Sequence, residues 1–132
     1  MQKGTLQDLL SIARKRVVVK VAELDGMEFT LRELSGTERD KFEAWTISEV
    51  DGKRTINTTY LRARLVALCM VDEGGARMVP DSEITTLSDG LSSSVLTTLF
   101  TAAQKLNGLD GAAVEDAAKN SESAATGASD SD

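Results

Sequence analysis

The longest apolar stretch of the chain, residues 58–73, has the spacing of a helix that is covered on most sides. Leu61, Leu65 and Leu68 recur at intervals of four and three residues, which places them on one helical face. The residues between them are also mostly apolar, and charged side chains occur only near the two ends. The pattern predicts a central helix that ends near Gly74-Gly75, where glycine can adopt the left-handed conformation.

Two segments before the central helix begin with the signature of a capping box. Thr5 is followed three residues later by Asp8, and Ser35 is followed in the same way by Glu38. The first box predicts a short amphipathic helix that continues to Arg14. The second predicts a longer helix with a charged, solvated face.

Between these two helices, residues 16–33 have the pattern of a β-hairpin. A valine-rich run and a run of alternating apolar and polar residues are joined by Asp25-Gly26. This dipeptide favours the tight turn that connects antiparallel strands. Residues 50–57 also contain an Asp-Gly pair, but their polar composition led us to predict a loop there.

The chain beyond the central helix predicts one tight turn and two helices. Residues 72–77 form the turn, across which Met70-Val71 and Met78-Val79 are expected to pair. A short helix is expected from Pro80 to about Leu87, and a second from Ser92 or Ser93 to Asn107-Gly108. The second helix carries an apolar face of these residues: Val95, Leu96, Leu99, Phe100, Ala102, Ala103 and Leu106.

Composition divides the 132 residues into a body and a tail. Residues 110–132 carry six acids and one lysine, so they hold most of the formal charge of −6. The tail is poor in large apolar side chains and is expected to be disordered. The fold class predicted is α+β: residues 1–109 form a small single domain in which a β-hairpin packs on about four to five helices, and residues 110–132 form a disordered acidic tail.

Several kinds of chemistry are excluded by the composition. There is no histidine, and Cys69 is the only cysteine, so a Ser-His or Cys-His catalytic pair, a structural zinc site and an intramolecular disulfide are ruled out. No phosphate-binding glycine loop and no calcium-loop spacing is found. We therefore expect a protein that is not an enzyme and that binds no metal or cofactor.

The same features restrict the partners. The nearly neutral body has no basic stripe, which argues against nucleic acid. No segment has the length of a membrane span or the apolar region of a signal peptide, so we expect a soluble protein that stays in the compartment where it is made. A buried Cys69 fits a reducing cytoplasm.

Over about residues 16–109 the sequence resembles the tail assembly chaperones of long-tailed, siphovirus-type bacteriophages. The specificity of the resemblance lies in the order and spacing of short pieces. These pieces are the hairpin ending in Arg32-Glu33-Leu34-Ser35, Glu38-Arg39 followed by Phe42 and Trp45, the run Arg62-Ala63-Arg64-Leu65-Val66-Ala67-Leu68-Cys69, the turn Asp72-Glu73-Gly74-Gly75-Ala76-Arg77, and Leu106-Asn107-Gly108-Leu109.

The resemblance implies a non-enzymatic protein of the host cell cytoplasm that is absent from the mature virion. It implies that the chain binds the tape measure protein, keeps it soluble and assists recruitment of the major tail protein. Self-association of the chain is considered as a further interaction, and the sequence leaves the oligomeric state open. The alternatives are a virion structural component, such as a minor tail or head–tail joining protein, and a small protein-binding regulator.

The family further implies a longer form, made by a programmed ribosomal frameshift, that contacts the major tail protein. Ala118-Lys119-Asn120 is compatible with the codons GCA AAA AAC, which contain a slippery heptamer. Other synonymous codons would abolish that heptamer, so the coding sequence decides whether a slip occurs there.

For the client site we predict an exposed apolar groove on the helical layer, because a tape measure helix would insert apolar anchors at helical spacing into such a groove. The candidates are Phe42, Trp45, Leu99 and Phe100. The alternative is that all four side chains belong to the core.

Overall fold

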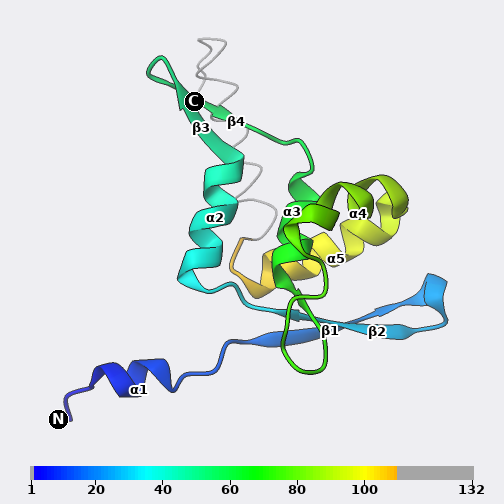
Figure 1. Ribbon diagram of the computed structural model, residues 1–132. Helices are drawn as coiled ribbons and strands as arrows, with labels where there is room; N and C mark the ends of the chain where they lie inside the picture. The colour runs from blue at the N-terminus through cyan, green and yellow to red at the C-terminus, as the bar shows by residue number, and fades with distance from the viewer. Residues whose placement is uncertain (1, 110–132) are drawn as a thin grey trace, which may run out of the picture.

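The computed structural model describes residues 2–109, in which five α-helices and two small antiparallel sheets form an α+β fold (Figure 1). The predicted fold class is confirmed for this part of the chain. The elements in chain order are α1 (Leu6–Leu10), β1 (Arg16–Val21), β2 (Met27–Arg32), α2 (Gly36–Thr46), β3 (Ile47–Val50), β4 (Lys53–Ile56), α3 (Leu61–Cys69), β5 (Met70–Val71), α4 (Ile84–Gly90) and α5 (Ser93–Leu106). Short 3-10 turns occupy Ala22–Leu24 and Asp81–Glu83.

The hairpin expected over residues 16–33 is present as β1 and β2. The strands are antiparallel and Val17 lies opposite Leu31. Asp25 and Gly26 have φ values of 56° and 76°, so both turn residues adopt the left-handed region that the Asp-Gly pair predicts. Leu31 is fully buried, and one face of the hairpin packs on the helices.

Both capping boxes are formed. The hydroxyl of Thr5 accepts from the backbone N–H of Asp8, and the hydroxyl of Ser35 accepts from that of Glu38. The first helix nevertheless leaves its apolar stripe in solvent, because Leu6, Leu9 and Leu10 are 66–67% exposed. Figure 1 shows α1 projecting from the end of the sheet. Local capping therefore forms this helix without a buried face.

The central helix is shorter than predicted. Its bounds are Leu61 and Cys69, and the two residues that follow form strand β5, which pairs with the free edge of β2. Met70 then accepts from the backbone N–H of Met78 at 3.0 Å, and Val71 bridges Arg77. The prediction that helix 58–73 ends at Gly74-Gly75 was wrong because cross-strand hydrogen bonds replace helical ones four residues earlier.

The predicted polar loop over residues 50–57 is also corrected. Strands β3 and β4 form a second hairpin around Asp51 and Gly52, which have φ values of 53° and 77°. Glu49 lies in β3 and faces Arg54 across the pair. The Asp-Gly turn thus directed strand pairing even though the flanking residues are mostly polar.

Helix α3 is central, as predicted. Figure 1 shows it surrounded by α2, α4, α5 and the larger sheet. Leu65, Val66 and Ala67 are fully buried, and Cys69 is 1% exposed, as the sequence predicted for a small buried side chain. The helix belongs to the main core cluster together with residues of β2 and α5.

Within residues 2–109, no helix has the length and apolar character needed to cross a membrane. The same residues contain no cluster of three or more potential metal-binding side chains. The predicted tail, with Ala118-Lys119-Asn120, lies outside the residues that the structure describes. The domain boundary at residue 109 therefore stays a prediction.

Candidate partner-binding groove

A groove of about 550 Å³ lies between the start of α3, the end of α4 and the outer side of α5. Its apolar surface comes mainly from Leu61, Leu96 and Phe100. Hydroxyl side chains and one cation complete the lining, which is made of Thr58, Tyr60, Leu61, Arg62, Ala63, Ser88, Leu96, Thr97, Phe100, Thr101 and Gln104. An apolar surface with scattered hydrogen-bonding groups is typical of a binding site.

Tyr60, at the edge of this groove, has an unusual backbone conformation. It is the N-cap of α3 and has φ of 58°, a left-handed value that is rare for a bulky side chain. The backbone N–H of Arg64 donates to its carbonyl at 2.8 Å, which fixes this residue to the first helical turn. Strained backbone that is held in place by neighbouring structure is often found at functional sites.

Gln104 gives the groove an unpaired polar group. The residue is 5% exposed and lines the groove, yet its side-chain amide has no hydrogen-bond partner among residues 2–109. A buried amide without a partner costs about 1–3 kcal/mol. The groove therefore offers a bound molecule the two N–H donors and the carbonyl acceptor of this amide, beside the Phe100 ring.

Of the four side chains predicted for the client site, two are in the core. Phe42 is 4% exposed and Leu99 is 3% exposed, and both belong to the main core cluster. Trp45 and Phe100 are half-buried. Phe100 lines the groove, whereas Trp45 packs near Ala63. The structure thus separates the two accessible aromatic side chains, and the client-binding role of the set stays a prediction.

Trp45 is covered by cations of its own chain. The Nζ atom of Lys41 lies 5.2 Å from the ring centroid, and the guanidinium carbon of Arg64 lies 5.6 Å from it. Lys41 and Arg77 also form ion pairs with Asp81. The pKa of the Asp81 carboxyl lies below its usual range, mainly because Lys41 donates a hydrogen bond to it. These contacts account for the partial burial of the indole without a partner protein.

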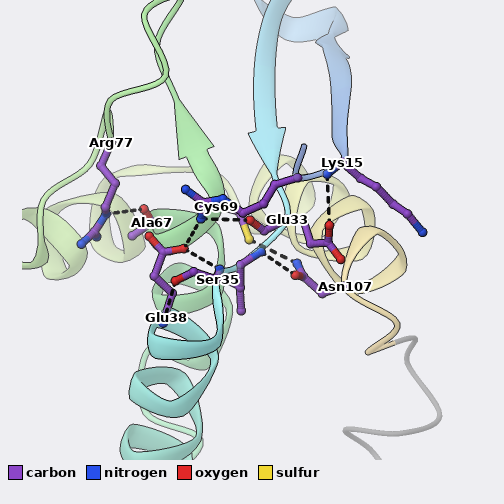
Figure 2. Close-up of polar contacts among 10 residues, drawn as sticks. Lys15, Glu33, Ser35, Glu38, Ala67, Cys69, Arg77 and Asn107 are labelled. Carbon is purple, nitrogen blue, oxygen red and sulfur yellow. Dashed lines mark hydrogen bonds and ion pairs between the residues drawn. The ribbon is translucent and has the colours of Figure 1, made fainter. Parts of the chain in front are cut away.

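A polar contact network at the C-terminal end of α5 connects the helices to the segment after the hairpin (Figure 2). The Oδ1 atom of Asn107 accepts from the backbone N–H of Leu34 at 2.8 Å. Its Nδ2 atom donates to the carbonyl of Ala103 at 2.8 Å and to the Sγ atom of Cys69 at 3.4 Å. One side chain therefore connects the segment after β2 with α3 and α5.

Cys69 is chemically inert in this setting. Burial raises the pKa of its thiol to about 12, and the hydrogen bond from Asn107 offsets only part of that shift. The reactive species is the thiolate, so the buried thiol stays protonated and unreactive near neutral pH. Cys69 is packed in the main core cluster.

The sequence did not single out Leu61, Leu96 or Gln104 as site residues. One signal was present, because Gln104 lies four residues after Phe100 and so interrupts the apolar face of α5 with a polar side chain. The contribution of Leu61 depends on how α3 packs against α5, which spacing within one helix does not reveal.

No family model and no curated protein matches this sequence. Among solved structures, the chain is similar to the tail assembly chaperone of bacteriophage HK97. The two share 18% sequence identity, and the match has a TM-score of 0.55 and covers 76% of this chain and 95% of that chain. The protein therefore has the fold of a phage tail assembly chaperone.

Proposed function

We propose that this protein is a phage tail assembly chaperone, a non-enzymatic factor that binds the tape measure protein and keeps it soluble before the tail is built. The observation that carries the proposal is the fold shared with the HK97 tail assembly chaperone over 95% of that chain. The order of sequence pieces over residues 16–109 points to the same class independently. The protein acts in the host cell cytoplasm and is absent from the mature virion.

The groove beside Phe100 is the proposed client site. An amphipathic helix binds a groove through apolar anchors that recur at three- and four-residue intervals. Leu61, Leu96 and Phe100 supply the matching apolar surface. A volume of about 550 Å³ accommodates anchor side chains of such a helix rather than the helix as a whole.

Gln104 adds a selectivity element to this site. Its unpaired amide favours a client segment that places a hydroxyl or carboxamide side chain beside an apolar anchor. A wholly apolar client would leave the amide without a partner and lose the corresponding hydrogen bonds. The proposed client helix therefore carries a serine, threonine, asparagine or glutamine next to its anchors.

Co-expression with the tape measure protein of the same phage tests this site. Phe100→Ala is expected to lower the soluble fraction of the tape measure protein, because it removes the aromatic surface of the groove. The matched control is Phe29→Ala: Phe29 is also half-buried and packs on the same core cluster, but it lies on β2, away from the groove lining. Equal solubilisation by the two variants would count against the groove. Trp45→Ala in the same assay reports on the surface around Trp45, a side chain that does not line the groove.

The chaperone role also predicts where the protein is found after assembly. We expect mass spectrometry of purified virions to detect the tape measure and major tail proteins but not this chain. A stoichiometric signal from residues 2–109 would favour the alternative, a structural component of the particle.

The proposal includes recruitment of the major tail protein through a frameshifted long form. In this scheme the body supplies the client-binding surface that both forms have in common. A −1 open frame that continues from codons 118–120 in the coding sequence is the expected mark of such a form.

A further inference from the structure

Strand β1 lies at the edge of the larger sheet (Figure 1). The strand order is β1-β2-β5, so β2 pairs with one side of β1 and no described strand pairs with the other. The opposite edge of the sheet differs, because the chain that follows β5 returns to bond with it. Met70 accepts from the backbone N–H of Met78, and Val71 bridges Arg77. An open strand edge such as that of β1 presents a row of backbone donors and acceptors that another chain can bind.

The strand register shows which residues face the open edge. The backbone N–H of Glu33 donates to the carbonyl of Lys15 at 2.8 Å, so this pair and every second pair along the hairpin exchange hydrogen bonds between β1 and β2. Arg16, Val18 and Lys20 alternate with the bonded residues, so their backbone groups point to the other side. None of these groups has a hydrogen-bond partner among residues 2–109. Each of the three residues therefore offers one N–H donor and one carbonyl acceptor.

The side chains of the same three residues are exposed on the face of the sheet that points away from the core. The valines that alternate with them pack in the main core cluster. Val18 is 52% exposed, and it lies between Arg16 and Lys20. Neither cation takes part in an ion pair within residues 2–109, although Glu28 lies opposite Lys20 in the register. The open edge thus has an apolar centre between two unpaired cations.

These side chains define the segment that would fit the edge. An antiparallel strand added there would place its own residues directly opposite Arg16, Val18 and Lys20. Cross-strand pairs of opposite charge are stabilising, and β-branched side chains favour strands. The matching segment carries acids opposite the two cations, a β-branched residue opposite Val18, and apolar residues at the two positions between them. Residues 15–20 contain three basic side chains and no acid, which strengthens the preference for an acidic partner.

A second copy of β1 fits this edge poorly. Antiparallel pairing centred on Val18 would place Arg16 of each copy opposite Lys20 of the other. Like charges opposite each other destabilise a strand pair, and cations on an edge strand are a common protection against association between identical edges. The same cations attract an acidic strand, so they select the partner.

We propose that the outer edge of β1 is a docking site for an extended acidic segment of a partner protein, which adds a fourth strand to the larger sheet. Main-chain hydrogen bonds to Arg16, Val18 and Lys20 supply the affinity, and the two cations supply the selectivity. This surface is separate from the proposed client groove, because none of the three residues lines that groove. The inference goes beyond the proposed chaperone role and does not depend on it.

Amide hydrogen exchange of the full-length chain, measured by NMR, tests the site. The probe is a peptide with blocked ends that contains Glu-Val-Thr-Val-Glu. With the peptide at about ten times its Kd, exchange at the amides of Arg16, Val18 and Lys20 should slow about tenfold, because only the free fraction exchanges. The amides of Val17 and Val19 donate to β2 and serve as internal controls.

Two methylated peptides separate strand addition from simple charge attraction. Methylation of the threonine amide removes the N–H that would donate to the carbonyl of Val18, so it should abolish the slower exchange. Methylation of the preceding valine amide changes an N–H that points away from the edge, so it should leave the slower exchange in place. Equal effects of the two methylated peptides would overturn the proposed strand addition.

A charge exchange tests the selectivity. Arg16→Glu/Lys20→Glu is expected to lose the response to the acidic peptide and to respond instead to Lys-Val-Thr-Val-Lys. The matched control, Lys3→Glu/Lys53→Glu, makes the same charge change at exposed positions elsewhere and should keep the preference for the acidic peptide. The same preference in both double variants, or no slowing of exchange by the acidic peptide at up to about 1 mM, would overturn the site. Slower exchange of the same amides when only unlabelled chain is added would assign the edge to a second copy and would also overturn the proposal.

Discussion

Leu65→Ala is expected to lower the free energy of unfolding by about 2–5 kcal/mol, the range found when a buried leucine is truncated in a protein core. Leu65 is fully buried at the middle of α3. This helix lies between α2, α4, α5 and the larger sheet (Figure 1). The substitution removes apolar contacts and leaves a cavity that tight packing on several sides prevents from collapsing. A domain of this size has only about 5–15 kcal/mol of stability, so soluble expression should also fall. Urea denaturation followed by circular dichroism measures the change.

Leu10→Ala provides a control with the same chemical change. Leu10 is 67% exposed on α1, so its truncation removes little buried surface. The free energy of unfolding should change by no more than about 0.5 kcal/mol. Similar midpoints for the two variants would show that α3 is not the centre of the core.

Local signals in the sequence were sufficient for the parts of the fold that depend on local hydrogen bonds. The capping box of Ser35 and Glu38 satisfies backbone groups within one helical turn, so it predicted the start of α2. Asp25-Gly26 likewise defined the β1–β2 turn because those two residues must adopt positive φ. Ser92 accepts from the backbone N–H of Val95 and begins α5, as expected.

Contacts between distant segments decided the parts that the sequence did not reveal. Residues Met70 and Val71 continue the apolar pattern of a helix, but they lie beside the free edge of β2 and pair with Thr30 and Leu31. The pattern alone does not show that a strand edge is available there. For β3 and β4 the turn signal was present at Asp51, but the mostly polar flanking residues do not show the apolar alternation that predicts a strand.

The residues of the candidate site also depend on contacts between distant segments, which the sequence does not reveal. An aromatic residue on an apolar helical face is compatible with burial in the core and with binding. The structure distinguishes Phe42, which is in the core, from Phe100, which lines the groove. The most informative residue of the groove is Gln104. Its significance depends on being buried without a partner, which is a property of the packed structure.

Asn107→Ala is expected to destabilise the protein by about 1–3 kcal/mol, the cost of leaving a buried hydrogen-bonding group unsatisfied. The main cause is the backbone N–H of Leu34, a residue only 8% exposed, which would lose its acceptor at 2.8 Å. The carbonyl of Ala103 and the thiol of Cys69 would each lose a donor as well. Chemical denaturation measures the loss, and the rate at which a thiol reagent modifies Cys69 should rise as the cover over its sulfur opens.

Asn57→Ala is the matched control for this network. The Oδ1 atom of Asn57 accepts from the backbone N–H of Thr59 at 3.0 Å, but the contact is in an exposed loop where water replaces a lost partner. Its effect should stay within about 0.5 kcal/mol. If Asn57→Ala and Asn107→Ala gave the same denaturation midpoint and left Cys69 equally protected, Asn107 would not be the residue that holds α3 and α5 to the segment after the hairpin. The contacts of Asn107 hold the end of α5 next to the segment after β2. If Cys69 in the Asn107→Ala variant still resisted the thiol reagent, apolar packing alone would be sufficient to hold α5 in place.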